Sequence, residues 1–258
     1  MEIFQAIVLG IIQGLTEFLP ISSSAHLFLV PYFFGWDYQG IGFDIALHWG
    51  SLLAVLIFFG KDYLRYAKAI FVPGHRDRKL AMFLALGTVP AAVLGYFFAD
   101  VIEYKLRHPL VTVATLAVFG VLLFIADRSG RKDAHIHDLN WKNTLFIGFA
   151  QAIALIPGVS RSGATITAGL VSHLKREKAA KFSFLLSGPV IFGAGLVVFQ
   201  DIERITAPFA AGFISSAVFG MIAIKLLLRF ISQRSFAVFT WYRIILAMVV
   251  LIVFFLRG

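Results

Sequence analysis

A run of polar side chains interrupts the apolar N-terminal part of the sequence. The stretch QGLTEFLPISSSAHLFL, residues 13–29, contains a carboxylate, three consecutive serines and an imidazole. A serine acts as a nucleophile when a base lies within hydrogen-bond reach, and an imidazole a few residues away is a candidate general acid or base. The stretch therefore indicates nucleophilic and acid–base chemistry, with candidate residues Glu17, Ser22, Ser23, Ser24 and His26.

A second polar stretch, PGVSRSGAT at residues 157–165, interrupts another apolar region. Its Pro-Gly pair predicts a turn, followed by the start of a short helix whose free N–H groups favour an anion. Arg161 adds a planar guanidinium, which can donate two parallel hydrogen bonds to phosphate oxygens. The stretch therefore predicts a phosphate-binding element that contains Ser160, Arg161 and Ser162.

Gln13 and Glu17 lie four residues apart, which places them on the same face of a helix. Two oxygen-bearing side chains in this arrangement suit a hard divalent cation, Mg²⁺ or Ca²⁺. We expect this pair to hold such a cation, or Glu17 to orient the imidazole of His26.

The composition indicates the environment in which these residues act. The chain has 258 residues, of which 59% are hydrophobic and 14% charged, and its mean hydropathy is +0.86; a soluble domain has about 25% charged residues. We predict an all-α polytopic membrane protein that forms one integral membrane domain, residues 1–258. The absence of cysteine excludes disulfides and thiolate metal ligands. Six runs approach or exceed the roughly 17–20 residues that cross a bilayer: Phe43–Phe59, Leu80–Ala99, Leu110–Ala126, Phe182–Phe199, Pro208–Leu228 and Phe236–Leu256.

The two polar stretches each separate apolar pieces that pair as hairpins. Residues 3–35 and residues 144–172 both consist of an apolar helix, a polar break and a second, short apolar piece. Broken backbone at membrane depth needs surrounding protein or water, so we predict two re-entrant hairpins; the alternative is that Ile3–Leu19 simply spans the membrane. At an offset of 138 residues, four pairs of identical residues align across the breaks: Gly10 with Gly148, Gln13 with Gln151, Ser22 with Ser160, and Ser24 with Ser162.

This alignment predicts two repeats, residues 1–126 and 141–258, each with one hairpin and three spans. Because three spans is an odd number, the second repeat must be inverted relative to the first, an architecture that recurs in membrane proteins. With both termini outside, sixteen of the 23 Lys and Arg residues fall in cytoplasmic loops around 60–79, 127–142, 172–181 and 229–235. This bias follows the positive-inside rule, and it explains the net charge of +9 without nucleic-acid binding.

A few ionisable residues lie within the apolar regions. We expect Lys225 and Arg243 to extend from near cytoplasmic helix ends to the lipid headgroups. Arg161 lies in a break, where an ionisable residue indicates function. Asp44 is expected at the outer interface, and His48 as a packed, hydrogen-bonded side chain.

The motifs QGLTEFLPISSSAH and PGVSRSGATIT resemble the two signature motifs of the undecaprenyl-diphosphate phosphatases, also called the bacitracin-resistance protein family. The similarity extends to FSFLLSGPVIFGAG, to IAIK in the fifth span and to YR in the last. The resemblance implies hydrolysis of a C55 polyprenyl diphosphate to its monophosphate and inorganic phosphate in the bacterial inner membrane, which recycles the lipid carrier for peptidoglycan. It also implies dependence on a divalent cation.

Carried onto this sequence, the family motifs assign catalytic roles to Glu17, Ser23, His26 and Arg161. We predict that the diphosphate contacts Ser22, Ser24, Ser160, Arg161, Ser162 and Thr165. The chain departs from the pattern at Gln13, where many members have Glu, so more of the acid–base and metal-binding role rests on Glu17. Either Ser23 or a water attacks phosphorus, with His26 as the proton-transfer partner.

A transporter or translocator of a polyprenyl phosphate lipid is the alternative function, because broken helices and charges at the membrane midplane are typical of carriers. The serine-rich break beside a histidine favours catalysis, since a carrier needs no nucleophile. The expected partners are the lipid substrate and membrane lipids. Glycines such as Gly188 and Gly193 allow close helix contacts within one chain or between two, so a homo-oligomer stays open.

Overall fold

Helices account for nearly all regular secondary structure. The computed structural model describes residues 2–197 and 205–257, apart from the side chains of residues 99, 100, 103 and 104. In this part of the chain there are ten α-helices and one short 3₁₀ helix: α1 (Ile3–Phe18), α2 (Ser23–Phe34), α3 (Ile41–Phe71), α4 (Arg78–Tyr104), α5 (Pro109–Arg128), η1 (Ile136–Asp138), α6 (Trp141–Ile153), α7 (Arg161–Val171), α8 (Arg176–Val197), α9 (Ala207–Ile231) and α10 (Ala237–Arg257).

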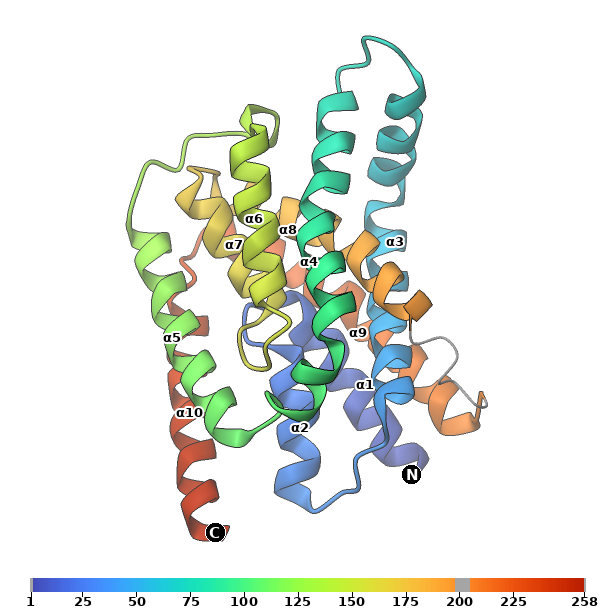
Figure 1. Ribbon diagram of the computed structural model, residues 1–258, viewed down its shortest axis with the longest axis vertical. Helices are drawn as coiled ribbons and strands as arrows, with labels where there is room; N and C mark the ends of the chain where they lie inside the picture. The colour runs from blue at the N-terminus through green and yellow to red at the C-terminus, as the bar shows by residue number, and fades with distance from the viewer. Residues whose placement is uncertain (1, 198–204, 258) are drawn as a thin grey trace.

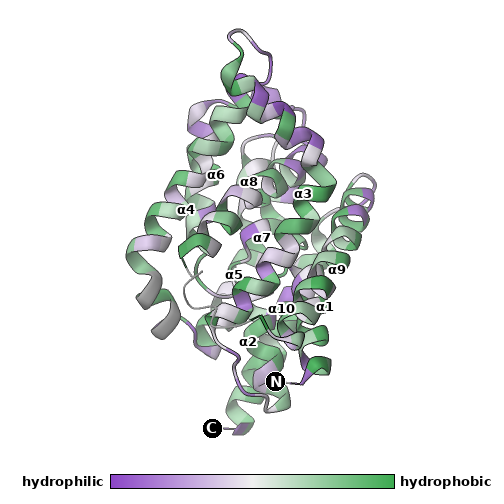
Figure 2. Ribbon diagram, turned by 90° about the vertical axis from the view of Figure 1, so that its right-hand side faces the viewer, coloured by the Kyte–Doolittle hydropathy of each residue, from purple (hydrophilic) through white to green (hydrophobic). Residues whose placement is uncertain are grey.

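Six of the described helices, α3, α4, α5, α8, α9 and α10, are long and apolar enough to cross a membrane. They coincide with the six predicted spans and confirm an all-α polytopic membrane protein; the end of the predicted span Phe182–Phe199 lies outside the described residues. Figure 2 shows hydrophobic residues along these helices and more hydrophilic ones at the end where α3 and α4 join.

The prediction of a cytoplasmic loop at residues 60–79 is wrong over most of that range, because much of it is helical. Helix α3 continues to Phe71, with one non-helical residue, Phe59 (φ −110°, ψ 16°), at a kink. The segment KDYLRYAKAIF at residues 61–71 is rich in good helix formers, so its basic residues lie on a helical extension. The predicted loop at 172–181 is also shorter, because α8 begins at Arg176.

Both polar stretches break the helices as predicted, and they do so with the same backbone geometry. Ser22 (φ 75°, ψ 95°) and Ser160 (φ 73°, ψ 111°) occupy a positive-φ conformation that residues other than glycine rarely adopt. Each caps the following helix, since the Ser22 hydroxyl accepts from the Ala25 N–H and the Ser160 hydroxyl from the Gly163 N–H. The two breaks therefore start α2 and α7 in equivalent ways.

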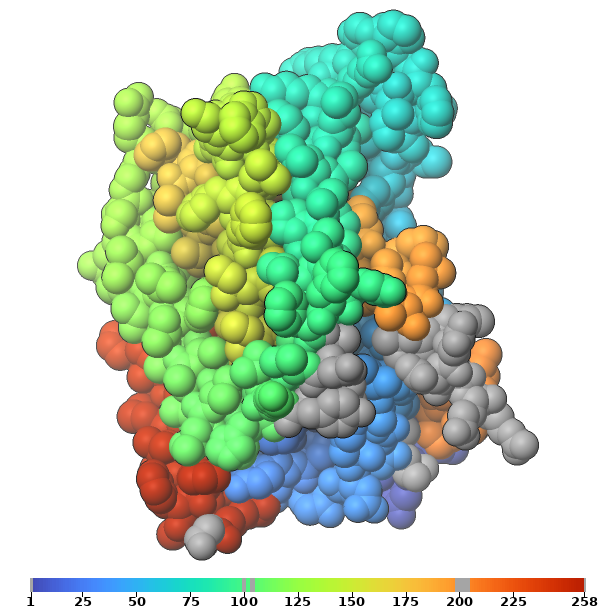
Figure 3. Space-filling model, in the orientation of Figure 1, coloured from blue at the N-terminus to red at the C-terminus, as the bar shows by residue number. Residues whose placement is uncertain are grey.

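The two hairpins approach each other from opposite ends of the molecule. In Figure 1, α1 and α2 occupy the lower half with both termini, whereas α6 and α7 occupy the upper half. Their turns are in contact, because the Ser162 hydroxyl donates to the Leu19 carbonyl at 2.9 Å. Helix α1 packs against α9, and α6 packs against α4; Figure 3 shows α4 and α6 side by side on the surface.

Glycines allow α9 to pack closely against α1 and α3. A Cβ atom at Gly14 would lie 2.5 Å from the Ser216 carbonyl oxygen, and one at Gly50 would collide with the carbonyl oxygen of Phe213. Small residues at helix contacts are a general feature of membrane helix packing, because they let backbones approach. This packing positions α1, which carries Gln13 and Glu17.

The prediction that Arg243 extends to the lipid headgroups is wrong. Its side chain is completely buried, and it donates hydrogen bonds at 2.9–3.3 Å to backbone carbonyls of both breaks and of α5. The acceptors are the carbonyl oxygens of Pro20, Gly158, Val159, Thr115 and Leu116. Lys225, by contrast, is exposed, as predicted. Arg243 thus ties the two turns to α10 and α5.

Gly50→Ala should lower the stability of the detergent-solubilised protein by about 1–3 kcal/mol, because the added methyl overpacks the α3–α9 contact. Gly60→Ala is the matched control on the same helix, since no neighbouring group lies within 4 Å of the place that a Cβ would take there; it should be neutral or stabilising by up to about 1 kcal/mol. Thermal unfolding followed by circular dichroism compares the two. Equal melting temperatures for both variants would contradict the close α3–α9 contact.

Arg243→Met should destabilise the protein by about 3–5 kcal/mol, because five buried carbonyls lose a charged donor. Lys225→Met on the neighbouring span removes an exposed cation and should change stability by less than about 0.5 kcal/mol. Unfolding in detergent measures both. A small effect of Arg243→Met would show that the breaks do not need the guanidinium.

Candidate active site

Glu17 is the centre of the site. It lies near the end of α1, its side chain is 5% exposed, and every oxygen of its carboxylate has partners from other elements. Glu17 Oε1 accepts from Arg161 Nη2 at 2.7 Å. Glu17 Oε2 lies near three groups: Ser23 Oγ at 2.5 Å, Gln13 Nε2 at 3.0 Å and His48 Nε2 at 3.6 Å. Residues from both polar stretches therefore meet at one carboxylate.

Ser23 is the first residue of α2, and its hydroxyl donates to Glu17. The helix begins here because the positive-φ residue before it reverses the chain direction, so the start of α2 faces the end of α1. A carboxylate that already accepts the hydroxyl proton at 2.5 Å can act as the base for a serine nucleophile. The geometry thus provides a nucleophile and base pair.

Arg161 reaches Glu17 from the second break, where it is the first residue of α7. Its other terminal nitrogen, Nη1, donates to the Ser183 carbonyl of α8 at 3.0 Å. Arg161 therefore carries a fixed positive charge beside Ser23. Ser23 and Arg161 are the first residues of α2 and α7, and the first-turn N–H groups and dipole of a helix start favour an anion.

His26 does not contact Ser23, although the sequence predicted this pairing. Its Nδ1 lies 2.7 Å from the Ser22 carbonyl oxygen and its Nε2 lies 2.6 Å from the Tyr242 hydroxyl. Because a carbonyl can only accept, Nδ1 carries a hydrogen, and in the neutral ring Nε2 accepts from Tyr242. The imidazole thus lies between the first break and α10.

Most of the other predicted diphosphate ligands already bind protein groups. Ser22 and Ser160 cap helices, Ser162 binds the Leu19 carbonyl, and Thr165 lies 2.6 Å from the Ser183 hydroxyl. These hydroxyls position the two breaks and α8. The Ser24 hydroxyl lies 3.2 Å from that of Ser22, and Ser24 also lines a cavity.

An apolar cavity of about 460 Å³ adjoins the site. It is bounded by α3, α4, α8 and the turn between α6 and α7, and its lining is largely Ala, Ile, Val, Leu, Pro and Gly. Ser24 lies in the first turn of α2, Pro157 belongs to the second break, and Arg107 follows α4. Arg107 pairs with Asp44 at 2.6 Å, so Asp44 forms an ion pair close to the cavity. A hydrocarbon chain suits this lining.

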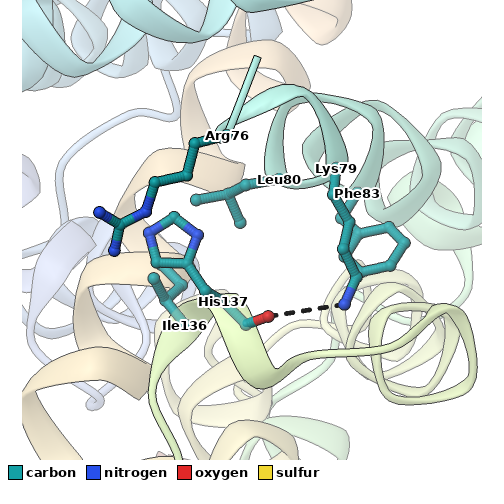
Figure 4. Close-up of a pocket in the computed structure, with 6 residues that line it drawn as sticks. All are labelled: Arg76, Lys79, Leu80, Phe83, Ile136 and His137. Atoms are coloured by element: carbon teal, nitrogen blue, oxygen red, sulfur yellow. Dashed lines mark hydrogen bonds between the residues drawn. The ribbon is translucent and has the colours of Figure 1, made fainter. Parts of the chain in front are cut away.

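A smaller cavity lies at the other end of α4 and does not include any predicted site residue. Figure 4 shows Arg76, Lys79, Leu80, Phe83, Ile136 and His137 around it, with the Lys79 ammonium 3.5 Å from the His137 carbonyl oxygen. Its cationic side chains are exposed, so this cavity has the character of a solvated surface depression.

Several residues of the site were not predicted from the sequence. Three of them lie in long apolar spans: Tyr242, Ser183 and Arg243, whose hydrogen bonds hold the two breaks. In such spans the periodicity of hydrophobic residues does not tell which helix face points inward. His48 was expected to be a packed residue, and it does bind the Asp44 carbonyl through Nδ1, but it also faces Glu17. The only signal was a charged or polar residue within an apolar run.

The donor atoms present fit a divalent cation at Gln13 and Glu17. Gln13 is fully buried, and its Oε1 has no hydrogen-bond partner. The amide nitrogen of Gln13 lies 3.0 Å from Glu17 Oε2. If the amide is turned over, Gln13 Oε1 takes that place, 3.0 Å from Glu17 Oε2. Two oxygens at this separation can both bind one cation at a metal–oxygen distance of about 2.1 Å. Among the described residues no three Asp, Glu, His or Cys side chains cluster as a metal site, so further ligands would come from water or a bound anion.

Comparisons with known proteins identify the family. The family model described as "Bacitracin resistance protein BacA" matches residues 6–249. A protein of Pelotomaculum thermopropionicum named undecaprenyl-diphosphatase is 46% identical over 98% of this chain and 97% of its own length. A protein of the same name from Thermodesulfovibrio yellowstonii is 48% identical over 100% of this chain and 99% of its own length. The protein therefore belongs to the bacitracin resistance protein family.

Proposed function

We propose that the protein hydrolyses undecaprenyl diphosphate to undecaprenyl phosphate and inorganic phosphate. The observation that carries this proposal is the hydrogen-bonded set of Ser23, Glu17 and Arg161 beside an apolar cavity. Such a set combines a nucleophile, a base and a cation for phosphoryl oxygens, and the relatives that match over the full length are named undecaprenyl-diphosphatase. The cavity would hold part of the prenyl chain.

Phosphoryl transfer depends mainly on positioning and on neutralising charge. Arg161 and the N-termini of α2 and α7 would bind the terminal phosphoryl group next to Ser23. Glu17 would take the proton from the attacking oxygen, which belongs to Ser23 or to a water in its place. The new oxygen–phosphorus bond would form as the bond from the terminal phosphorus to the bridging oxygen breaks, and undecaprenyl phosphate would leave. Attack by water would release inorganic phosphate directly, whereas attack by Ser23 would give a phosphoserine that a water must then hydrolyse.

A divalent cation, Mg²⁺ or Ca²⁺, is part of the proposal, with Gln13 and Glu17 as its protein ligands. Its charge would offset that of the diphosphate. Glu17 would keep its contact with Arg161 through Oε1, and Gln13 would present the oxygen that otherwise lacks a partner in the buried site.

We further propose that the two halves are inverted repeats with re-entrant hairpins, which places the site near the middle of the inner membrane and both termini outside. The equivalent geometry of Ser22 and Ser160 supports this reading. So does the exchange of contacts between halves, since α1 packs on α9 as α6 packs on α4. The reaction would then recycle the lipid carrier of peptidoglycan synthesis.

Arg161→Ala and Arg161→Lys should each lower phosphate release by about 10²–10³-fold, because a flexible ammonium cannot replace the guanidinium fork. The assay measures phosphate released from a polyprenyl diphosphate by purified protein in detergent, with Mg²⁺, with Ca²⁺ and with chelator. Chelator should abolish release. Folded wild-type protein that releases no phosphate with any metal would favour a lipid translocator instead.

Glu17→Gln should lower kcat by about 10²–10⁴-fold, because an amide cannot accept the nucleophile's proton. Tyr242→Phe removes only the partner of His26, so its kcat should fall by less than about tenfold. Both values come from initial rates at saturating substrate. If Tyr242→Phe were as impaired as Glu17→Gln, the proton would pass through His26 rather than Glu17.

A further inference from the structure

His48 lies where it could bind the cation proposed above. It is on α3, and its Nε2 is 3.6 Å from Glu17 Oε2. Its side chain is 25% exposed, whereas Glu17 is 5% exposed, so one edge of the ring is open beside a buried carboxylate. Ile41 and Ile45, seven and three residues earlier, line the apolar cavity; His48 therefore lies on the helix face that leads from the cavity to Glu17.

The other ring nitrogen is held in place by the protein backbone. Nδ1 lies 2.7 Å from the Asp44 carbonyl oxygen, which can only accept, so Nδ1 carries the hydrogen. Asp44 is itself held by its ion pair with Arg107. Metal-binding histidines commonly donate one ring N–H to a carbonyl or carboxylate, which fixes the tautomer and directs the other nitrogen at the ion. His48 has this arrangement, with Nε2 directed at Glu17.

The distances are compatible with one shared ion. Two ligand atoms at about 2.2 Å from an ion are roughly 3.1 Å apart at a right angle and 4.4 Å apart when opposite. The separation of 3.6 Å between His48 Nε2 and Glu17 Oε2 falls within this range. The buried Gln13 adjoins the same carboxylate oxygen: with its amide turned over, its oxygen would take the place of Nε2, 3.0 Å from Glu17 Oε2.

We propose that His48 is a third protein ligand of the divalent cation, together with Gln13 and Glu17, and that it shifts the preference of the site from Mg²⁺ and Ca²⁺ toward divalent transition metals, for which Mn²⁺ serves as the paramagnetic probe. This inference rests on the proposed cation dependence of the phosphatase. Carboxylate and amide oxygens alone suit Mg²⁺ and Ca²⁺, whereas an imidazole ligand favours transition metals. The remaining coordination positions would be open to water and to diphosphate oxygens.

Electron paramagnetic resonance of Mn²⁺ bound to the chelator-treated protein in detergent tests the inference without substrate. In wild-type protein, bound Mn²⁺ should show the nitrogen hyperfine coupling of a directly bound imidazole. His48→Gln should lose this coupling and bind Mn²⁺ about tenfold or more weakly, while its affinity for Mg²⁺ should change less. His135→Gln is the control, because that ring lies in an exposed loop beside Lys175, and it should leave the spectrum unchanged.

The outcomes separate this inference from the proposed function. Wild-type protein that releases phosphate with Mn²⁺ but shows no imidazole coupling would overturn the role of His48 and leave the phosphatase standing. Nitrogen coupling that persists in His48→Gln would also overturn it. Coupling that depends on His48 in a protein that releases no phosphate would support the metal site and contradict the phosphatase. Size-exclusion profiles and melting temperatures matching wild type establish that His48→Gln is folded.

Discussion

The backbone of a buried helix break has to be hydrogen-bonded by the protein itself, because a buried carbonyl without a donor costs free energy. This constraint applies twice here, at residues 19–22 and 154–160, and Arg243 meets much of it in both places. A guanidinium has five N–H donors in one plane, and this one serves carbonyls of both turns and of α5. The two breaks are consequently attached to the same side chain, and their relative position follows from it.

The chemistry of the site depends on that attachment. With the turns held together, Arg161 of one break reaches Glu17 beside the other at 2.7 Å. A buried carboxylate and a buried guanidinium would each be costly alone, but together they neutralise one another. The same contact leaves Ser23 on the second carboxylate oxygen. In the proposed reaction, the ion pair that makes the charges tolerable would therefore also activate the nucleophile and bind an anion.

The sequence predicted the six spans and both breaks, because length, hydropathy and proline are local properties. It also singled out Gln13, Ser23 and Arg161, three of the residues that meet at Glu17, since polar and ionisable groups are rare in apolar segments. The partners of His26 and Arg243 could not be predicted. His26 is three residues from Ser23, but its ring points to Tyr242, more than two hundred residues away. Arg243 is near a helix end in sequence, yet α10 packs on α5 and turns the side chain inward.

What the sequence by itself determined is the set of elements and the family: membrane-spanning helices, two capped breaks and a short group of chemically active residues. Local sterics and the hydrophobic effect are sufficient for these, because each depends on residues close together in the chain. The tertiary structure alone decided which oxygen of Glu17 meets which donor and which imidazole faces it. Those contacts join α1, α2, α3 and α7, and their geometry follows from how the helices pack. Glycines such as Gly14 and Gly50 permit this packing, but no local sequence pattern specifies it.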